Sequence, residues 1–198
     1  MKRFFDIIFS LFAILIFSPL FIIISIAIVI DSGFPIFYKQ KRMGKNYKEF
    51  YLYKFRSMIK DADKIGSLVT TKNDKRITKV GKFLRKTKLD ELPQFFNVLI
   101  GDMSIVGPRP EVAKYANHYK EDFEYILSKV KPGITDEASI QYRNEEKLLD
   151  NIDNHEQIYI TELLPKKLRL AKEYADNHNI LNDLIIICKT VIVVLFKH

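Results

Sequence analysis

The hydrophobic pattern divides the chain into an apolar start and a longer segment in which apolar and polar positions alternate. Ile7 to Ile30 is a run of 24 residues without a charge. At 1.5 Å per residue a straight helix of this length reaches roughly 36 Å, enough to cross a hydrocarbon core of about 30 Å. Pro19, preceded by Ser18, falls near the middle, and proline removes a backbone donor and clashes with the preceding turn. The pattern therefore predicts a membrane helix with a kink or break at Ser18-Pro19.

Two topologies fit this segment. Basic residues flank it on both sides, with Lys2 and Arg3 before it and Lys39 and Lys41 after it, and the positive-inside rule keeps such flanks in the cytoplasm. A re-entrant helix, which enters one leaflet and returns, satisfies this rule and the central proline; a proline-kinked spanning helix is the alternative. A cleaved signal peptide is disfavoured, because the run continues into Asp31–Pro35 without a small-residue cleavage site.

The rest of the chain alternates short predicted elements with polar connections. Ile180–Phe196 is again apolar, but Asp183 and Lys189 interrupt it, so we interpret it as an interfacial amphipathic helix. The basic residues Lys166, Lys167, Arg169 and Lys172 before it either meet lipid headgroups or form a solvated face. The other expected elements are a polar turn at Gln40–Tyr47, a strand at Phe50–Phe55, a polar loop at Asp61–Asp74, and helices at Ile77–Arg85, from Asp90 to Gly101, at Glu111–Val130 and at Pro165–Asp176.

Composition and charge narrow the classes of protein. The 198 residues are 47% hydrophobic, which suits a folded core, while one cysteine and four scattered histidines exclude a disulfide scaffold and a zinc finger. The net charge of +8 is concentrated in residues 39–60, with eight basic residues and one acidic, and 72–90, with eight and two. This basic collar beside the apolar segment suits anionic headgroups or phosphorylated ligands; with the aromatic residues of Phe50–Phe55 it also permits single-stranded nucleic acid.

The chemistry-bearing candidate is the acidic pair Asp90-Glu91, which bases such as Arg85 and Lys88 surround. Adjacent carboxylates at a cationic helix start could hold Mg²⁺ together with substrate phosphate oxygens, or one carboxylate could attack phosphorus. On spacing alone a structural role is favoured, in which Asp90 caps a helix and Glu91 complements its dipole. Arg109, between Pro108 and Pro110, lies on a stiff turn that suits a guanidinium presented to phosphate. P-loop, G-x-G-x-x-G and G-x-S-x-G motifs are absent.

A set of motifs in a fixed order resembles the bacterial sugar transferase family, and the chain is similar to its small monotopic phosphoglycosyl transferases. The similarity extends from the Ser18-Pro19 break to Lys131–Thr135. The motifs that carry it are Lys54–Met58, Leu84-Arg85, Leu89–Gln94, Asn97–Leu99, Gly101–Ser104 and Val106–Pro110.

The resemblance implies an enzyme that transfers a phosphosugar from a UDP-sugar to a polyprenol phosphate of the undecaprenyl type and releases UMP. This is the first membrane step of glycan assembly at the cytoplasmic face of the bacterial inner membrane. It implies Asp90 as the nucleophile, through a covalent aspartyl-phosphosugar, with Mg²⁺ beside Asp90 and Glu91. Ser18-Pro19 then favours the re-entrant helix. The other residues of these motifs that we expect to bind the substrate are Lys54, Arg56, Arg85, Pro108, Arg109 and Pro110.

The predicted fold is therefore α+β and mostly helical, with a re-entrant membrane anchor over residues 1–38 and a catalytic domain over 39–198 that includes the C-terminal interfacial helix. After Thr135 the chain departs from the Gly-Trp-Ala pattern of larger family members and reads Asp136 to Arg143, so no family role is carried onto that stretch. Two non-enzymatic alternatives remain: a membrane-tethered scaffold and a nucleic-acid-binding module, both using the basic collar.

Overall fold

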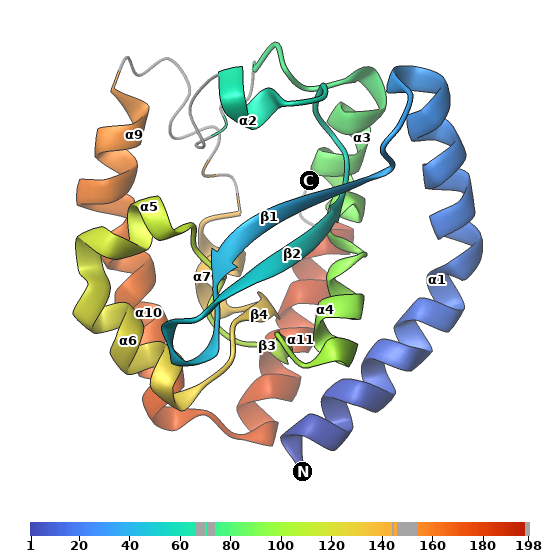
Figure 1. Ribbon diagram of the computed structural model, residues 1–198. Coiled ribbons are helices and arrows are strands. Elements are labelled where there is room, and N and C mark those ends of the chain that lie inside the picture. The colour runs from blue at the N-terminus through green and yellow to red at the C-terminus, as the bar shows by residue number, and fades with distance from the viewer. Residues whose placement is uncertain (66–69, 71–73, 144, 146–153, 197–198) are drawn as a thin grey trace.

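A computed structural model describes residues 1–65, 70, 74–143, 145 and 154–196 of the chain. The protein is mostly helical, as the sequence predicts, and its strands form two small sheets. The long helix α1 (Lys2–Ser32) runs along one side of the molecule beside α3 (Lys79–Thr87) and α4 (Gln94–Ile100), and its axis bends along its length (Figure 1). The helix continues through Pro19 without interruption, so of the expected kink or break at Ser18-Pro19 the break is absent.

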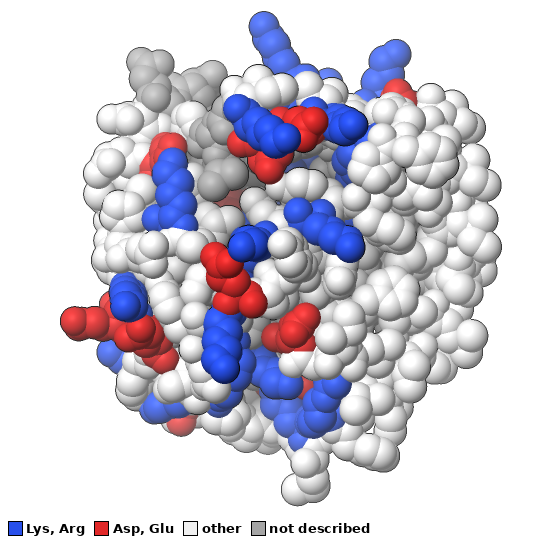
Figure 2. Space-filling view, viewed as in Figure 1, with Lys and Arg blue, Asp and Glu red and all other residues white. Residues whose placement is uncertain are grey.

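Helix α1 buries the apolar Ile24 and Ile28 near its end, but its first half has the reverse of the side-chain distribution of an ordinary surface helix. Its polar residues Asp6 and Ser10 are buried, at 3% and 0% exposure, whereas Phe12 and Leu15 are 63% and 72% exposed. The surface over α1 is correspondingly free of charge along most of its length (Figure 2). Large exposed apolar patches on a folded protein mark a partner or a membrane. Of the helices in the described ranges, α1 alone is long and apolar enough to cross a membrane.

Both ends of α1 are fastened to the folded body. Near its start, Lys2 Nζ lies 2.6 Å from an Asp183 carboxylate oxygen, and Asp6 Oδ1 accepts hydrogen bonds from Ser104 Oγ and the Ile105 amide, each at 3.0 Å. At its end, Arg56 Nη2 donates to the Ser32 and Gly33 carbonyl oxygens at 2.8 and 2.6 Å. The helix therefore lies along one side of a single packed unit.

An antiparallel hairpin crosses the front of the molecule and positions one wall of the candidate site. Strand β1 (Phe37–Met43) pairs with β2 (Glu49–Phe55) in a register that sets Tyr38 opposite Lys54. The predicted strand Phe50–Phe55 is thus confirmed. The polar turn expected at Gln40–Tyr47 is wrong in its first half, because Gln40 to Met43 belong to β1, and the turn is the 3₁₀ segment Lys45–Tyr47.

A second, parallel pair holds the Pro108–Pro110 turn against the body. Strand β3 (Ser104–Val106) pairs with β4 (Gly133–Thr135). At its edge a Cβ on Gly107 would lie 2.3 Å from the Lys131 carbonyl oxygen, and one on Gly133 would lie 2.1 Å from the Gly107 nitrogen. Because real Cβ atoms do not approach backbone atoms so closely, the two strands can lie this near to each other only if both positions are glycine.

Helix α3 packs beside α1, whereas most of the later helices build the core on the side away from α1. The predicted helices Ile77–Arg85, Pro165–Asp176 and Ile180–Phe196 are confirmed as α3, α10 and α11, whereas Glu111–Val130 is divided at Asn117–Tyr119. The loop Asp61–Asp74 begins with a short helix and lies partly outside the described residues. The remaining segments are α2 (Ala62–Ile65), the 3₁₀ turn η2 (Leu89–Glu91), α5 (Ala113–Ala116), η3 (Asn117–Tyr119), α6 (Lys120–Lys129), α7 (Glu137–Gln141), α9 (His155–Ile158), the π-helical η4 (Tyr159–Leu163), α10 (Leu164–Asn177) and α11 (Ile180–Phe196).

Candidate active site

The acidic pair lies on the tight connection between α3 and α4. Lys88 adopts a left-handed conformation with φ of 60° at the end of α3, and the chain then makes the single 3₁₀ turn η2 that contains Asp90 and Glu91. Helix α4 begins only at Gln94, with Pro93 before it. The expected role of Asp90 as the N-cap of this helix is therefore wrong. Asp90 is nevertheless only 4% exposed, so its burial needs another explanation.

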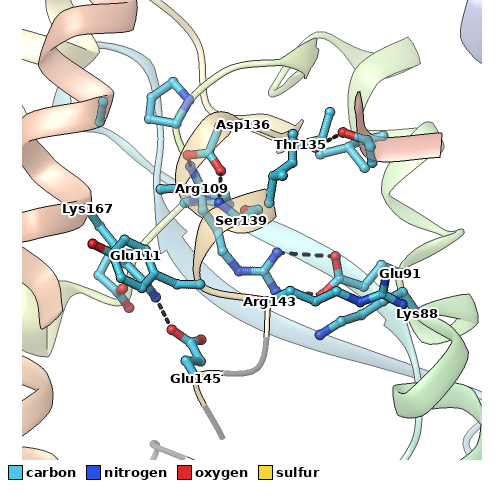
Figure 3. A pocket seen from close by; sticks show the side chains of 18 of the residues that line it. Lys88, Glu91, Arg109, Glu111, Thr135, Asp136, Ser139, Arg143, Glu145 and Lys167 are labelled. Atoms are coloured by element: carbon cyan, nitrogen blue, oxygen red, sulfur yellow. Dashed lines mark hydrogen bonds and ion pairs between the residues drawn. The ribbon is translucent and has the colours of Figure 1, made fainter. Parts of the chain in front are cut away.

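Glu91 is held by two cations from distant parts of the chain. Lys54 Nζ of β2 lies 2.9 Å from Glu91 Oε1. Arg109 approaches with both terminal nitrogens, Nη2 at 2.5 Å from Oε1 and Nη1 at 3.2 Å from Oε2 (Figure 3). Burial alone would raise the pKa of Glu91, but Arg109 and Lys54 hold the pKa well below its usual range. Glu91 is thus a fixed anion that positions two cations.

Asp90 has the opposite environment. Burial raises the pKa of Asp90, an effect that the nearby Lys54 and Arg85 only partly offset. Its buried Oδ1 has no hydrogen-bond partner. A carboxylate oxygen that is buried and unpartnered costs folding free energy, of about 1–3 kcal/mol or more for a charged group. Such a group is typical of a functional site, because a bound ligand can complete its environment.

The turn that carries Arg109 is fixed from two sides. The Arg109 amide donates to Asp136 Oδ2 at 3.1 Å, while Asp136 Oδ1 accepts from the Ser139 amide at 2.7 Å and so caps α7 (Figure 3). After the turn, Glu111 accepts from Arg42 Nη1 at 3.2 Å. This rigidity agrees with the expected role of the Pro108-Arg109-Pro110 turn, which is to present the guanidinium in a set direction.

The structure places the other predicted binding residues unevenly. Lys54 and Arg85 line the same cavity as Asp90. Arg56 also lines it, with its buried Nε and Nη1 unpartnered, although its Nη2 is engaged with the end of α1. Ser18 and Pro19 are exposed in the middle of α1 and line neither this cavity nor a second, smaller one, although the adjacent Phe17 lines the smaller cavity together with Glu91. The basic motif residues Lys54, Arg56 and Arg85 are therefore together with Asp90, and Ser18 and Pro19 are not part of this group.

Two cavities meet at the Glu91–Arg109 pair. The larger, of about 620 Å³, contains Asp90 and is lined by charged side chains from β1, β2 and η2. The smaller, of about 340 Å³, is mostly apolar, and α1, α4, α7 and α11 contribute to its wall. Both volumes fall in the range of small-molecule sites. The two cavities share a charged boundary made by Lys88, Glu91, Arg109, Glu111, Arg143, Glu145 and Lys167.

Sequence reasoning missed part of this boundary. Lys167 of α10 was expected either at lipid headgroups or on a solvated face, but its side chain is 14% exposed and forms an ion pair with Glu145 (Figure 3). Arg143 and Asp136 lie in the stretch that departs from the family pattern. No local signal identifies them, because their position depends on how α7 packs against α10 and α11.

The acidic pair can be tested for its fit to a divalent cation. The unpartnered Asp90 Oδ1 is a suitable ligand for Mg²⁺, which is bound in many sites by one or two carboxylates with substrate phosphates and water. Both Glu91 oxygens accept from Lys54 or Arg109, so this carboxylate is already neutralised. In the described ranges no group of three or more His, Cys, Asp or Glu side chains forms a cage. The site therefore fits a metal ion that has Asp90 as its protein ligand and takes its other ligands from a phosphorylated substrate and water.

Comparison with known proteins gives a consistent result. The family model described as bacterial sugar transferase matches residues 1–197. The chain is 45% identical over 157 residues to a UDP-glucose:undecaprenyl-phosphate glucose-1-phosphate transferase of Klebsiella pneumoniae, covering 77% of this chain and 33% of the relative. It is 40% identical over 141 residues to a UDP-N-acetylgalactosamine-undecaprenyl-phosphate N-acetylgalactosaminephosphotransferase of Aeromonas hydrophila, covering 70% and 33%.

A third relative aligns with nearly the whole chain. It is an undecaprenyl-phosphate galactose phosphotransferase of Salmonella typhimurium, 38% identical over 210 residues, which cover 98% of this chain and 40% of the relative. The chain thus spans 33–40% of the length of these three relatives. Their names share undecaprenyl phosphate and differ in the sugar.

Proposed function

Because the chain belongs to the bacterial sugar transferase family, we propose that it transfers a sugar phosphate from a UDP-sugar to a polyprenol phosphate of the undecaprenyl type. The observation that carries this proposal is the buried Asp90, with a free carboxylate oxygen, beside a Glu91 that holds Lys54 and Arg109 in place. A diphosphate donor needs such cations, and a nucleophile needs an unengaged oxygen.

In this proposal the reaction runs in two steps. In the first, an Asp90 carboxylate oxygen attacks the sugar-bearing phosphorus of the UDP-sugar; the bond from this phosphorus to the bridging oxygen breaks, and UMP leaves. In the second, a phosphate oxygen of the acceptor attacks the same phosphorus, which releases the Asp90 carboxylate and forms a polyprenol-diphosphate sugar. Lys54 and Arg109 neutralise the phosphate oxygens in both steps, and Glu91 keeps these cations in position.

Mg²⁺ is part of this proposal, with Asp90 Oδ1 as its protein ligand, whereas Glu91, which the sequence also placed beside the metal, holds Lys54 and Arg109 instead. When bound, it would supply positive charge to the phosphates of the donor. Arg85, Arg56 and Lys88 line the same cavity and add further positive charge around the nucleotide.

The proposal is tested by the half-reaction. Enzyme, Mg²⁺ and a UDP-sugar, without acceptor, should release about one UMP per active site and then stop, because the covalent phosphosugar has nowhere to go. UDP-glucose, UDP-galactose and UDP-N-acetylgalactosamine form the first panel of donors. Removing Mg²⁺ with a chelator should abolish the release. UMP formation only when both substrates are present would instead indicate direct transfer in a ternary complex.

We further propose that residues 1–38 form a re-entrant anchor and residues 39–198 a catalytic domain on the cytoplasmic face of the inner membrane. The contacts of Lys2 with Asp183 and of Arg56 with Ser32 support this topology. A helix with both ends fastened to one body leaves that body on one side of the membrane.

Thiol labelling tests this topology. Cysteines at Lys2 and Lys45, in a Cys188→Ser background, should both resist a membrane-impermeant reagent in intact cells and react once the cells are opened. Labelling of the Lys2 position from outside would establish a spanning helix. As a comparison, replacing Ser18 and Pro19 with Ala and Leu should favour a straight spanning helix and expose the Lys2 position.

A further inference from the structure

The smaller cavity has an apolar body and one charged end. Its apolar part is lined by Leu92 and Phe95 next to η2 and α4, by Ala138 and Ile140 of α7, and by Val193 of α11. Its charged end is the boundary shared with the larger cavity, where the cations exceed the carboxylates by one (Figure 3). The cations are Lys88, Arg109, Arg143 and Lys167, and the carboxylates are Glu91, Glu111 and Glu145. Asp90 lines the larger cavity but not this one. A ligand that fits this space has an anionic head and an apolar body.

The apolar part is continuous with the helices that present apolar surface. Phe17 of α1, 37% exposed, forms part of the wall, and so does the C-terminal half of α11. Both helices expose large apolar side chains on their outer faces, among them Leu15 of α1 and Leu184 of α11. A chain that leaves the cavity past Phe17 and α11 therefore meets apolar surface rather than charged surface.

Helix α11 is fixed to this cavity by polar contacts. Thr190 Oγ1 lies 2.7 Å from Thr135 Oγ1 of β4, and Arg143 donates to the Val193 carbonyl oxygen. These bonds place the Val193 position at the cavity and leave Val191, 49% exposed, outside it. The wall is thus a defined surface and not the flexible end of a helix.

We infer that this cavity takes the first isoprene units of the acceptor, with the acceptor phosphate at Lys88 and Arg109, while the larger cavity takes the UDP-sugar. This assignment rests on the proposed function. It explains why two cavities of opposite character share one charged boundary: the donor phosphates and the acceptor phosphate must reach the same phosphorus in turn. A nucleotide is a poor occupant of the smaller cavity, because its ribose and uracil would lose water without polar partners.

A matched pair of variants tests the assignment by binding alone. Val193→Phe fills the cavity, whereas Val191→Phe makes the same change two positions away on the exposed face. Binding of farnesyl phosphate in detergent micelles is measured for both variants and the wild type, with methyl phosphate as a probe of the head alone and UDP as a probe of the donor cavity. We expect Val193→Phe to weaken farnesyl phosphate binding by at least about tenfold, because buried CH₂ groups are lost. UDP and methyl phosphate binding should be unchanged, and Val191→Phe should match the wild type in all three.

Equal farnesyl phosphate binding in Val193→Phe and wild type would overturn the inference, as would an equal loss in Val191→Phe. A second measurement uses the unaltered protein and so does not depend on how a variant folds. A farnesyl phosphate that carries a photoreactive diazirine on its tail should label peptides from α7 or α11; labelling confined to the outer face of α1 would overturn the assignment. Neither measurement requires turnover. If the wild type releases UMP but Val193→Phe binds farnesyl phosphate as the wild type does, the acceptor assignment of the smaller cavity is refuted and the proposed reaction stands. If binding depends on the isoprenoid tail but no UMP is released, the proposed reaction is refuted.

Discussion

Asp90→Asn should reduce the UMP burst and the overall transfer by at least about a thousandfold while the protein remains folded. The amide has nearly the volume of the carboxyl group but cannot attack phosphorus. Folding should survive, because Asp90 Oδ1 has no hydrogen-bond partner to lose, and the neutral amide avoids the cost of a buried charge. The size and rate of the UMP burst are measured by rapid quench, and thermal unfolding shows whether the variant is folded.

Asp102→Asn is the matched control for this change. Asp102 lies just after α4, outside both cavities, so the same chemical substitution there should leave the burst unchanged. Mass spectrometry of the wild type after the burst should find the phosphosugar on the peptide that contains Asp90. Because burial raises the pKa of Asp90, the burst rate should fall as the pH decreases through that raised pKa. An Asp90→Asn variant with nearly full activity would leave Asp90 only a structural role.

Arg109→Lys should slow the transfer by about a hundredfold, in line with the loss of one oriented donor at a developing charge. Lysine keeps the charge but cannot make the two parallel contacts by which Arg109 binds Glu91. The measurement is the steady-state rate of transfer to polyprenol phosphate. Arg169→Lys changes an exposed arginine that pairs along its own helix with Glu173, and it should have no effect.

A double-mutant cycle separates two roles of Arg109. If Arg109 only neutralises Glu91, then Glu91→Gln makes it dispensable, and Glu91→Gln with and without Arg109→Lys should have the same rate. If Arg109 also binds substrate phosphate, the double variant should be slower than Glu91→Gln alone. We expect the second result, because the Arg109 turn is held independently of Glu91 by the bond between its amide and Asp136.

The sequence predicted the family, the long apolar helix and several helices correctly, since these depend on motifs and local periodicity. Strand β1 was missed because its residues from Lys39 to Arg42 are all polar and resemble a polar turn, although pairing with β2 makes them part of a strand. The N-cap at Asp90 was wrong because the left-handed Lys88 precedes a separate 3₁₀ turn, Leu89–Glu91, which ends before α4 begins at Gln94.

The sequence identified the main residues of the candidate site, but it did not predict which of them contact one another. Asp90, Glu91 and Arg109 were identified as candidates, yet the ion pair between Glu91 and Arg109 joins residues 18 positions apart and depends on the packing of the parallel strands. Asp183 shows the same limit. In the sequence it interrupts an apolar helix; in the fold it is 2% exposed and accepts from both Lys2 and Tyr174. The contacts with Lys2 and Tyr174 explain why a charged residue lies within this apolar helix.

The contact between Lys2 and Asp183 also bears on how the protein is made. The two residues are 181 positions apart, so at about 5–20 residues per second the ribosome adds Asp183 roughly 10 to 35 s after Lys2. Ser104 and Ile105, the partners of Asp6, follow it by 98 and 99 positions, so α1 is synthesised well before either set of contacts can form. Under the proposed anchor topology, α1 therefore enters the bilayer before its polar residues meet their partners, and α11 secures it only later.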